Sequence, residues 1–221
     1  MRDPVNFPPE SGPVREPAVT APPAALWLAG LLVAAFLLQT FLASSGVVES
    51  LAYTPSPGVF SQPITLFTAI WLHGGWGHLA MNTAFALAFA TPLARFFGPR
   101  PRGFAALFLY FLACGVLGNL GFGLLHAGQP LGLIGASGGV SGLAAGAARI
   151  VGGEGRIGGF RSPFVLSMGG AWIVSNLVVA LTGGAITPGG AQIAWEAHLA
   201  GFAAGLLLIR PFAALAGVPR A

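Results

Sequence analysis

Three polar side chains in an otherwise apolar chain stand at nearly the same distance before an arginine. Asn82, Ser137 and His198 each precede an arginine by 12 or 13 residues. If those arginines mark one face of a bilayer, a rise of about 1.5 Å per residue puts the three groups roughly 18 to 20 Å from it, inside a hydrocarbon core about 30 Å thick. A serine, a histidine and an amide at one buried depth predict a reaction centre.

Ser137 is the candidate nucleophile. It stands in the sequence Gly-Ala-Ser-Gly at 135–138, directly after a loop, so we expect a helix to begin at the depth of the serine rather than at the membrane surface. The free backbone amides and the positive dipole end of such a helix would stabilise an oxyanion. The alternative is that Ser137 serves only as a helix cap or as a small packing residue.

His198 is the candidate base. It shares a helical face with Gly201 and Gly205, and Ser137 shares one with Ser141 and two alanines further along. Two stripes of small residues would let the helices approach closely and bring the imidazole to the hydroxyl. A neutral histidine could then accept the hydroxyl proton and return it to the leaving amine. The alternative is a histidine that only links two helices by a hydrogen bond.

His78 and Asn82 are four residues apart and therefore lie on one helical face. Both can donate hydrogen bonds without a negative charge, which suits stabilisation of an oxyanion better than base catalysis. Glu196 lies 200° around the helix from His198, so we expect it to face a neighbour or water rather than to orient the histidine.

Zinc is the competing interpretation of His73, His78 and His198. The chain has no His-Glu-x-x-His sequence and no carboxylate beside the His73/His78 pair, and Cys114 belongs to another apolar segment. We therefore expect no metal and no cofactor.

The elements that position these residues are predicted by composition. Hydrophobic residues make up 55% of the chain, charged residues 7%, and the mean hydropathy is +0.79. Such a chain cannot present the charged exterior of a soluble domain, so we predict an integral membrane protein in contact with the lipid bilayer. The net charge of +4 comes with ten arginines scattered between apolar segments, which suits membrane topology and not a nucleic-acid partner.

Six apolar segments predict an all-α polytopic membrane protein with six transmembrane helices. All ten arginines fall outside these segments or at their ends on one side, and the loops on the other side contain none. The positive-inside rule assigns the arginine side, and therefore both termini, to the cytoplasm. The predicted spans are 24–43, 77–97, 104–125, 134–151, 163–182 and 193–212.

Three regions follow from this pattern. Residues 1–23 hold seven prolines without apolar periodicity and predict a disordered cytoplasmic tail. Residues 24–212 form the membrane domain, and 213–221 a short cytoplasmic tail. A cleavable signal peptide is the alternative for the first span, although about 20 apolar residues exceed the usual signal core. The aromatic-rich outer loop 44–76 is expected to lie in the membrane interface.

Three ordered segments resemble the rhomboid family of intramembrane serine proteases: His-Leu-Ala-Met-Asn at 78–82, Gly-Ala-Ser-Gly at 135–138, and Ala-His-Leu-Ala-Gly-x-x-x-Gly at 197–205. The resemblance implies a six-helix core, transmembrane proteins as substrates and a bacterial inner membrane as location. It implies Ser137 as nucleophile, His198 as general base and acid, and an oxyanion hole of His78, Asn82 and the Ser137 amide. The residues expected to pack beside the site are Gly135, Gly138, Ser141, Gly201 and Gly205.

The chain departs from the family pattern at several positions. Ala94 replaces a glutamate that many relatives carry before the glycine ending the second helix, and the Trp-Arg pair of the first outer loop is absent. Ser141 replaces an aromatic residue that packs on the catalytic histidine, so we expect His198 to be held less rigidly or by different partners. The alternatives to a protease are a catalytically silent rhomboid-like protein that binds client helices, and a small transporter.

Overall fold

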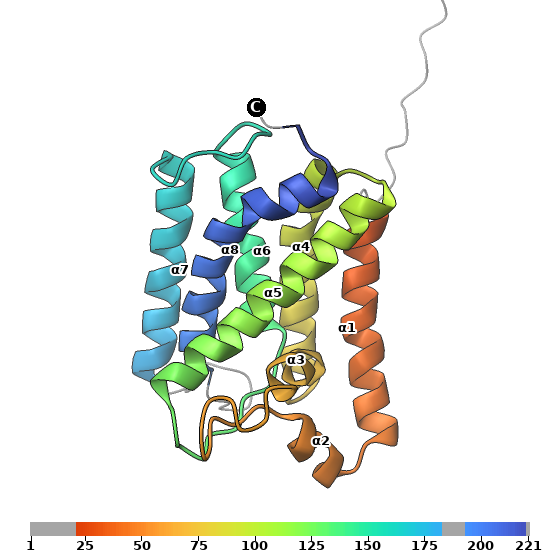
Figure 1. Ribbon diagram of the computed structural model, residues 1–221, viewed down its shortest axis with the longest axis vertical. Coiled ribbons are helices and arrows are strands. Elements are labelled where there is room, and N and C mark those ends of the chain that lie inside the picture. Colours follow the sequence, from red (N-terminus) through yellow and green to blue (C-terminus); the bar gives the residue numbers. More distant parts are fainter. Residues whose placement is uncertain (1–20, 183–192, 220–221) are drawn as a thin grey trace, which may run out of the picture.

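The computed structural model describes residues 21–182 and 193–219 and is all-helical there, apart from one isolated β-bridge. The predicted all-α class is confirmed for this part of the chain. Residues 1–20 of the predicted disordered tail and the outer segment 183–192 lie outside the described residues. The long helices are α1 (Pro23–Leu42), α4 (Trp76–Phe97), α5 (Pro101–Leu125), α6 (Ser137–Val151), α7 (Pro163–Thr182) and α8 (Trp195–Ala216) (Figure 1).

Four of the described helices, α1, α5, α7 and α8, are long and apolar enough to cross a bilayer. The other two long helices differ for reasons visible in their sequences. α6 has 15 residues, which gives a length of about 22 Å against a core of about 30 Å. α4 has 22 residues but carries His78, Asn82 and Arg95.

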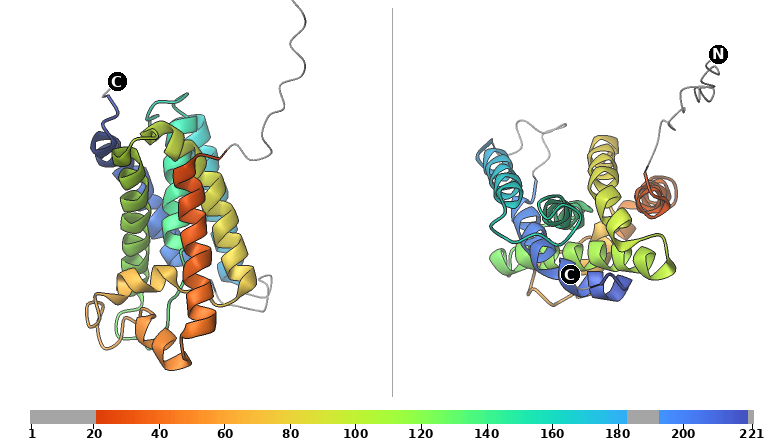
Figure 2. Two further views of the ribbon diagram at one scale, coloured as in Figure 1. Left: turned by 90° about the vertical axis from the view of Figure 1, so that its right-hand side faces the viewer. Right: turned by 90° about the horizontal axis from the view of Figure 1, so that it is seen from above.

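The bundle is organised around α6. Every residue from Gly138 to Ile150 is buried, in contact with α4, α5 and α8. Figure 2 shows α6 in the middle of the bundle when seen from above, with α1 and α7 at opposite edges. Ser137, which opens α6, is half-buried at one end of this central helix.

Glycines set the contact between α6 and α8. A β-carbon at Gly201 would collide with the Gly138 carbonyl oxygen and lie 3.0 Å from its Cα, and one at Gly205 would lie 2.7 Å from the Cα of Gly142. The Tyr110 hydroxyl of α5 lies 2.8 Å from the Gly142 carbonyl oxygen and 2.9 Å from that of Gly205. Close packing through Gly201 and Gly205 was predicted, but the α6 stripe that receives them is Gly138 and Gly142, not the Ser137 face.

The segment between α1 and α4 contains the short helices α2 (Ser45–Leu51) and α3 (Thr65–Thr68) and the 3₁₀ turn η1 (Ala69–Trp71). Tyr53 forms a β-bridge with Leu133, and the Asn119 side chain of α5 donates to the Leu66 carbonyl at 2.8 Å. These contacts fix the loop to the end of the bundle where α6 begins. Its placement in the membrane interface stays a prediction.

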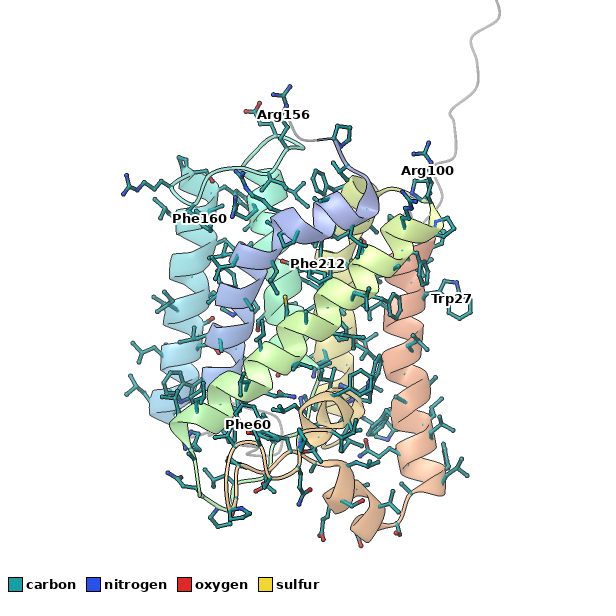
Figure 3. The ribbon with its side chains drawn as sticks, viewed as in Figure 1. Trp27, Phe60, Arg100, Arg156, Phe160 and Phe212 are labelled. Atoms are coloured by element: carbon teal, nitrogen blue, oxygen red, sulfur yellow. The ribbon has the colours of Figure 1, made fainter. Side chains whose placement is uncertain are left out.

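The opposite end carries arginines. Arg100 and Arg156 lie at the end of the bundle away from Phe60 (Figure 3). Arg149 is buried there: it donates to the carbonyls of Gly158 and Leu206 and lies 4.1 Å from the centroid of the Phe160 ring. It therefore fixes the loop between α6 and α7 instead of extending to solvent.

Two helices extend at least three residues beyond their predicted spans, whereas α6 begins three residues inside its own. α5 begins at Pro101, three residues before the predicted start, because proline is favoured in the first turn of a helix. α8 continues to Ala216 and ends where Gly217 takes a left-handed conformation with φ of 78°. Figure 1 shows α8 changing direction towards this end, where Pro211 lies inside the helix and removes a backbone hydrogen bond.

Candidate active site

Ser137 is the first residue of α6, which confirms that a helix begins at the serine. Gly135, two residues earlier, has φ of 130° and donates its amide to the Ala69 carbonyl at 2.9 Å. The first amides of α6 have no acceptor within the helix. The Ser141 hydroxyl donates to the Ser137 carbonyl at 2.7 Å, so Ser141 is bound to its own helix. The half-buried serine hydroxyl therefore lies beside free amides at a positive helix end.

His78 and Asn82 lie on one face of α4, and His78 faces the serine. The Gly74 amide donates to His78 Nδ1 at 3.2 Å, and Asn82 Nδ2 donates to the His78 carbonyl at 3.1 Å. A β-carbon placed on Gly135 would lie 2.9 Å from His78 Nε2 and 3.8 Å from Ser137 Oγ. The edge of the His78 ring and the Ser137 hydroxyl are therefore both next to the α-carbon of residue 135. A side chain at this position would collide with His78, so only glycine keeps the space free.

His198 lies in the first turn of α8, and its ring is fixed from α7. Its Nδ1 is 2.7 Å from Oδ1 of Asn176, and Nδ2 of Asn176 donates to the Trp172 carbonyl at 2.8 Å. The expectation that His198 has a partner other than an aromatic residue at position 141 is confirmed. The partner itself was missed, although an amide in an apolar span is a signal that sequence alone contains.

The turns that carry Ser137 and His198 are in contact. A β-carbon at Gly138 would lie 3.4 Å from the Ala197 carbonyl oxygen, and one at Gly118 would lie 2.8 Å from that oxygen and 3.1 Å from the Gly138 Cα. The described residues contain no hydrogen bond between the Ser137 hydroxyl and the His198 ring. Catalytic hydrogen bonds of this kind are often long before substrate binds.

The two histidines are held in opposite tautomers by their partners. A backbone amide can only donate, so Nδ1 of His78 accepts and Nε2 carries the proton of the neutral ring. The Asn176 oxygen can only accept, so Nδ1 of His198 carries the proton and Nε2 has the free lone pair. His78 is thus prepared to donate a hydrogen bond, and His198 to take a proton.

His73 packs edge-on against His78, with ring centroids 5.2 Å apart. Its backbone is bound on both sides by the Gln39 side chain of α1, but its two ring nitrogens are buried without a hydrogen-bond partner. Burial and the neighbouring His78 lower the pKa of His73 to about 4. No group of three potential metal ligands occurs among the described residues.

Glu196 faces a neighbour, as predicted. Its carboxylate lies 2.9 Å from Nε2 of His126, the residue that caps the C-terminus of α5. This pair joins the ends of α5 and α8. Since the carboxylate binds His126, the group that orients His198 comes from α7 and not from its own helix.

A family comparison covers the whole of this constellation. The model of the rhomboid domain matches residues 61–214, which include α4, the start of α6, α7 and α8. A search of curated proteins found no match. The match spans more than half of the chain and contains each of the three segments that carry the sequence resemblance. The chain therefore belongs to the rhomboid family and is an integral, multi-pass membrane protein.

Proposed function

We propose that the chain is an intramembrane serine endopeptidase that cleaves membrane proteins in or near their transmembrane segments. The observation that carries the proposal is the arrangement around Gly135 and Gly138. The edge of the His78 ring and the Ser137 hydroxyl lie next to Gly135. The turn that carries His198, whose ring is protonated on the other nitrogen, contacts Gly138. This arrangement supplies a nucleophile, a base and a hydrogen-bond donor at one helix N-terminus.

Each residue has one role in the proposed reaction. Ser137 Oγ attacks the carbonyl carbon of the scissile peptide bond as its proton passes to Nε2 of His198. The carbonyl oxygen becomes an oxyanion that accepts from His78 Nε2, the second N–H of Asn82 Nδ2, and the Ser137 amide. The C–N bond then breaks, and His198 gives its proton to the leaving amine. Water, deprotonated by His198, then attacks the acyl carbon, the bond from that carbon to Ser137 Oγ breaks, and His198 returns the proton to Oγ.

The proposed topology has six membrane-spanning helices with both termini in the cytoplasm. α4 and α6 join the four apolar helices, since α6 is buried in the bundle and α4 turns its polar residue Asn82 inward while packing against α1, α5 and α6. The positive-inside rule supports the orientation, because every arginine lies in the predicted cytoplasmic segments or at their borders. We propose the bacterial inner membrane as the location.

The substrate must present an unwound segment, because the peptide bonds of an intact helix are hydrogen-bonded and sterically closed. In lipid, an unsatisfied backbone group costs several kcal/mol, so unwinding is easiest where glycine or proline already weakens the helix. We therefore propose substrates with such residues near the cut and a small residue before it.

Covalent labelling tests the proposal. The purified full-length protein should react with a fluorophosphonate probe, and a Ser137→Ala variant should not. In proteoliposomes, the same pair should differ in cleavage of a transmembrane substrate carrying a Gly-Pro segment. Equal labelling of the two proteins would defeat the assignment. A cellular phenotype that persists in Ser137→Ala would instead favour a silent protein that binds client helices.

A further inference from the structure

We infer that Asn176 of α7 is a positioning residue that fixes the tautomer and orientation of His198, so that the proposed Ser/His pair operates with a third member. The inference rests on the proposed function for its catalytic meaning. Its geometric basis is the 2.7 Å contact between Asn176 Oδ1 and His198 Nδ1.

The burial of Asn176 is unusual for its helix. α7 lies at the edge of the bundle, and only Val165 and Asn176 of its 20 residues are buried. An amide inside a membrane helix is costly unless its donors and acceptor have partners. Asn176 is turned towards α8, and each end of its amide is bound.

The direction of the amide follows from its partners. Asn176 Nδ2 donates to the Trp172 carbonyl at 2.8 Å. A reversed amide would place its oxygen against that carbonyl, where neither atom can donate. The oxygen must therefore face His198, and an amide oxygen accepts only. Nδ1 of His198 consequently carries the proton, and Nε2 is left as the base.

The Trp172 turn that orients Asn176 is itself fixed to α8. The Trp172 ring stacks on Phe202 with centroids 5.8 Å apart and an interplanar angle of 21°. Phe202 lies one turn of α8 beyond His198. Ser141, the residue at the position where the family resemblance implies an aromatic support, instead uses its hydroxyl on the Ser137 carbonyl. The support of His198 in this chain thus comes from α7.

Kinetics of three variants test the catalytic part. Asn176→Leu keeps the approximate size of the side chain but removes the acceptor, and should lower kcat about 10- to 100-fold with KM within about twofold. Asn176→Asp keeps the acceptor oxygen but loses the hydrogen bond to the Trp172 carbonyl, and should retain more of kcat than Asn176→Leu. Its negative charge stabilises the protonated ring, so the acid limb of its kcat/KM profile should move to higher pH by about half a unit or more. The matched control is Ser167→Ala, which removes an exposed hydroxyl of α7 that donates only to the Phe164 carbonyl and does not touch the Trp172 carbonyl.

A spectroscopic measurement tests the geometry without activity. The ¹⁵N spectrum of the full chain labelled at histidine, with His198 assigned by difference from His198→Gln, should show a neutral ring protonated at Nδ1. In Asn176→Leu that signal should change to a mixture of tautomers, whereas Ser167→Ala should leave it unchanged.

The outcomes separate the inference from the proposed function. If the wild type cleaves substrate and Asn176→Leu cleaves it equally well, the inference is wrong and the proposed function stands. Loss of activity in both Asn176 variants, with lowered thermal stability and no change in the pH profile, would reduce Asn176 to a packing residue. If the wild type reacts with the fluorophosphonate probe no better than Ser137→Ala, the proposed function and the catalytic role of Asn176 are both wrong. Separately, a His198 ring protonated at Nε2 would show that Asn176 does not fix the tautomer.

Discussion

His78 and His198 are the same side chain placed in two differently built regions. His78 receives a hydrogen bond on Nδ1 from the Gly74 amide, four residues earlier in the chain. His198 gives one from Nδ1 to the Asn176 amide oxygen, on another helix. The partner of the remote nitrogen thus decides what Nε2 can do: it is a donor in His78 and a proton acceptor in His198.

The two regions also differ in how they are held together. The contacts of His78 are local in sequence, since the Gly74 amide and Asn82 each lie four residues from it. The His198 side depends on the packing of three helices, with α7 supplying the amide and α6 the glycine surface. Damage to helix packing should therefore affect His198 more than His78.

The same substitution at both histidines gives the largest expected contrast. His198→Gln removes the base, because an amide cannot take the serine proton, and should lower kcat/KM by about 10³-fold or more. Cleavage of a transmembrane substrate in proteoliposomes measures the loss, with thermal stability in detergent as the control for folding. Retention of more than about a tenth of the activity would show that His198 is not the base.

His78→Gln should be milder, because glutamine still offers an N–H to an oxyanion. We expect kcat to fall by about 10-fold, while His78→Phe, which has no donor, should lose about 100-fold or more. The two variants are compared in the same proteoliposome assay. If His78→Gln is as inactive as His198→Gln, the two histidines do not have different roles.

Gly201→Ala should loosen the packing on which the His198 side depends. Its β-carbon would collide with the Gly138 carbonyl, so α6 and α8 must separate, at a cost of about 1 to 3 kcal/mol. The matched control is Gly30→Ala in α1, where a β-carbon meets nothing within 4 Å and stability should stay equal or rise slightly. Unfolding in detergent compares the two, and equal stabilities would contradict the close packing.

His73→Phe should give the smallest effect, visible only as a pH dependence of stability. The pKa of His73 in the folded protein is about 4, below its usual 6.5. The folded state thus binds fewer protons, and its stability is full above pH 6.5 and decreases as the pH falls towards 4. Phenylalanine removes this dependence, which is absent at pH 7 and reaches about 3 kcal/mol on going from pH 6.5 to pH 4, while retaining an aromatic contact with Phe36. If the stabilities of wild type and variant depend on pH in the same way, the lowered pKa of His73 is contradicted.

The features predictable from sequence were those determined by neighbours along the chain. The loop directly before the Gly-Ala-Ser-Gly sequence predicted the start of α6 at Ser137, and helical periodicity placed His78 and Asn82 on one face. Apolar segments located the long helices, but they missed Pro101 in the first turn of α5 and the last turn of α8, which continues beyond residue 212 to Ala216.

The remainder depends on contacts between distant segments. Several small residues near Ser137 could form the α6 stripe, and only the rotation of α6 against α8 selects Gly138 and Gly142. The bond from Asn176 to His198 spans 22 residues and depends on how α7 is turned. Arg149 likewise becomes buried because the following loop folds back over it.

A structure of the fluorophosphonate adduct tests the central claim most directly, since the phosphoryl oxygen takes the place of the oxyanion. We expect phosphorus bonded to Ser137 Oγ, with the phosphoryl oxygen bound by His78 Nε2, Asn82 Nδ2 and the Ser137 amide. His198 should lie on the other side of the adduct, still bonded to Asn176 through Nδ1. A phosphoryl oxygen bound by His198, or an adduct on a residue other than Ser137, would contradict the division of roles between the two histidines.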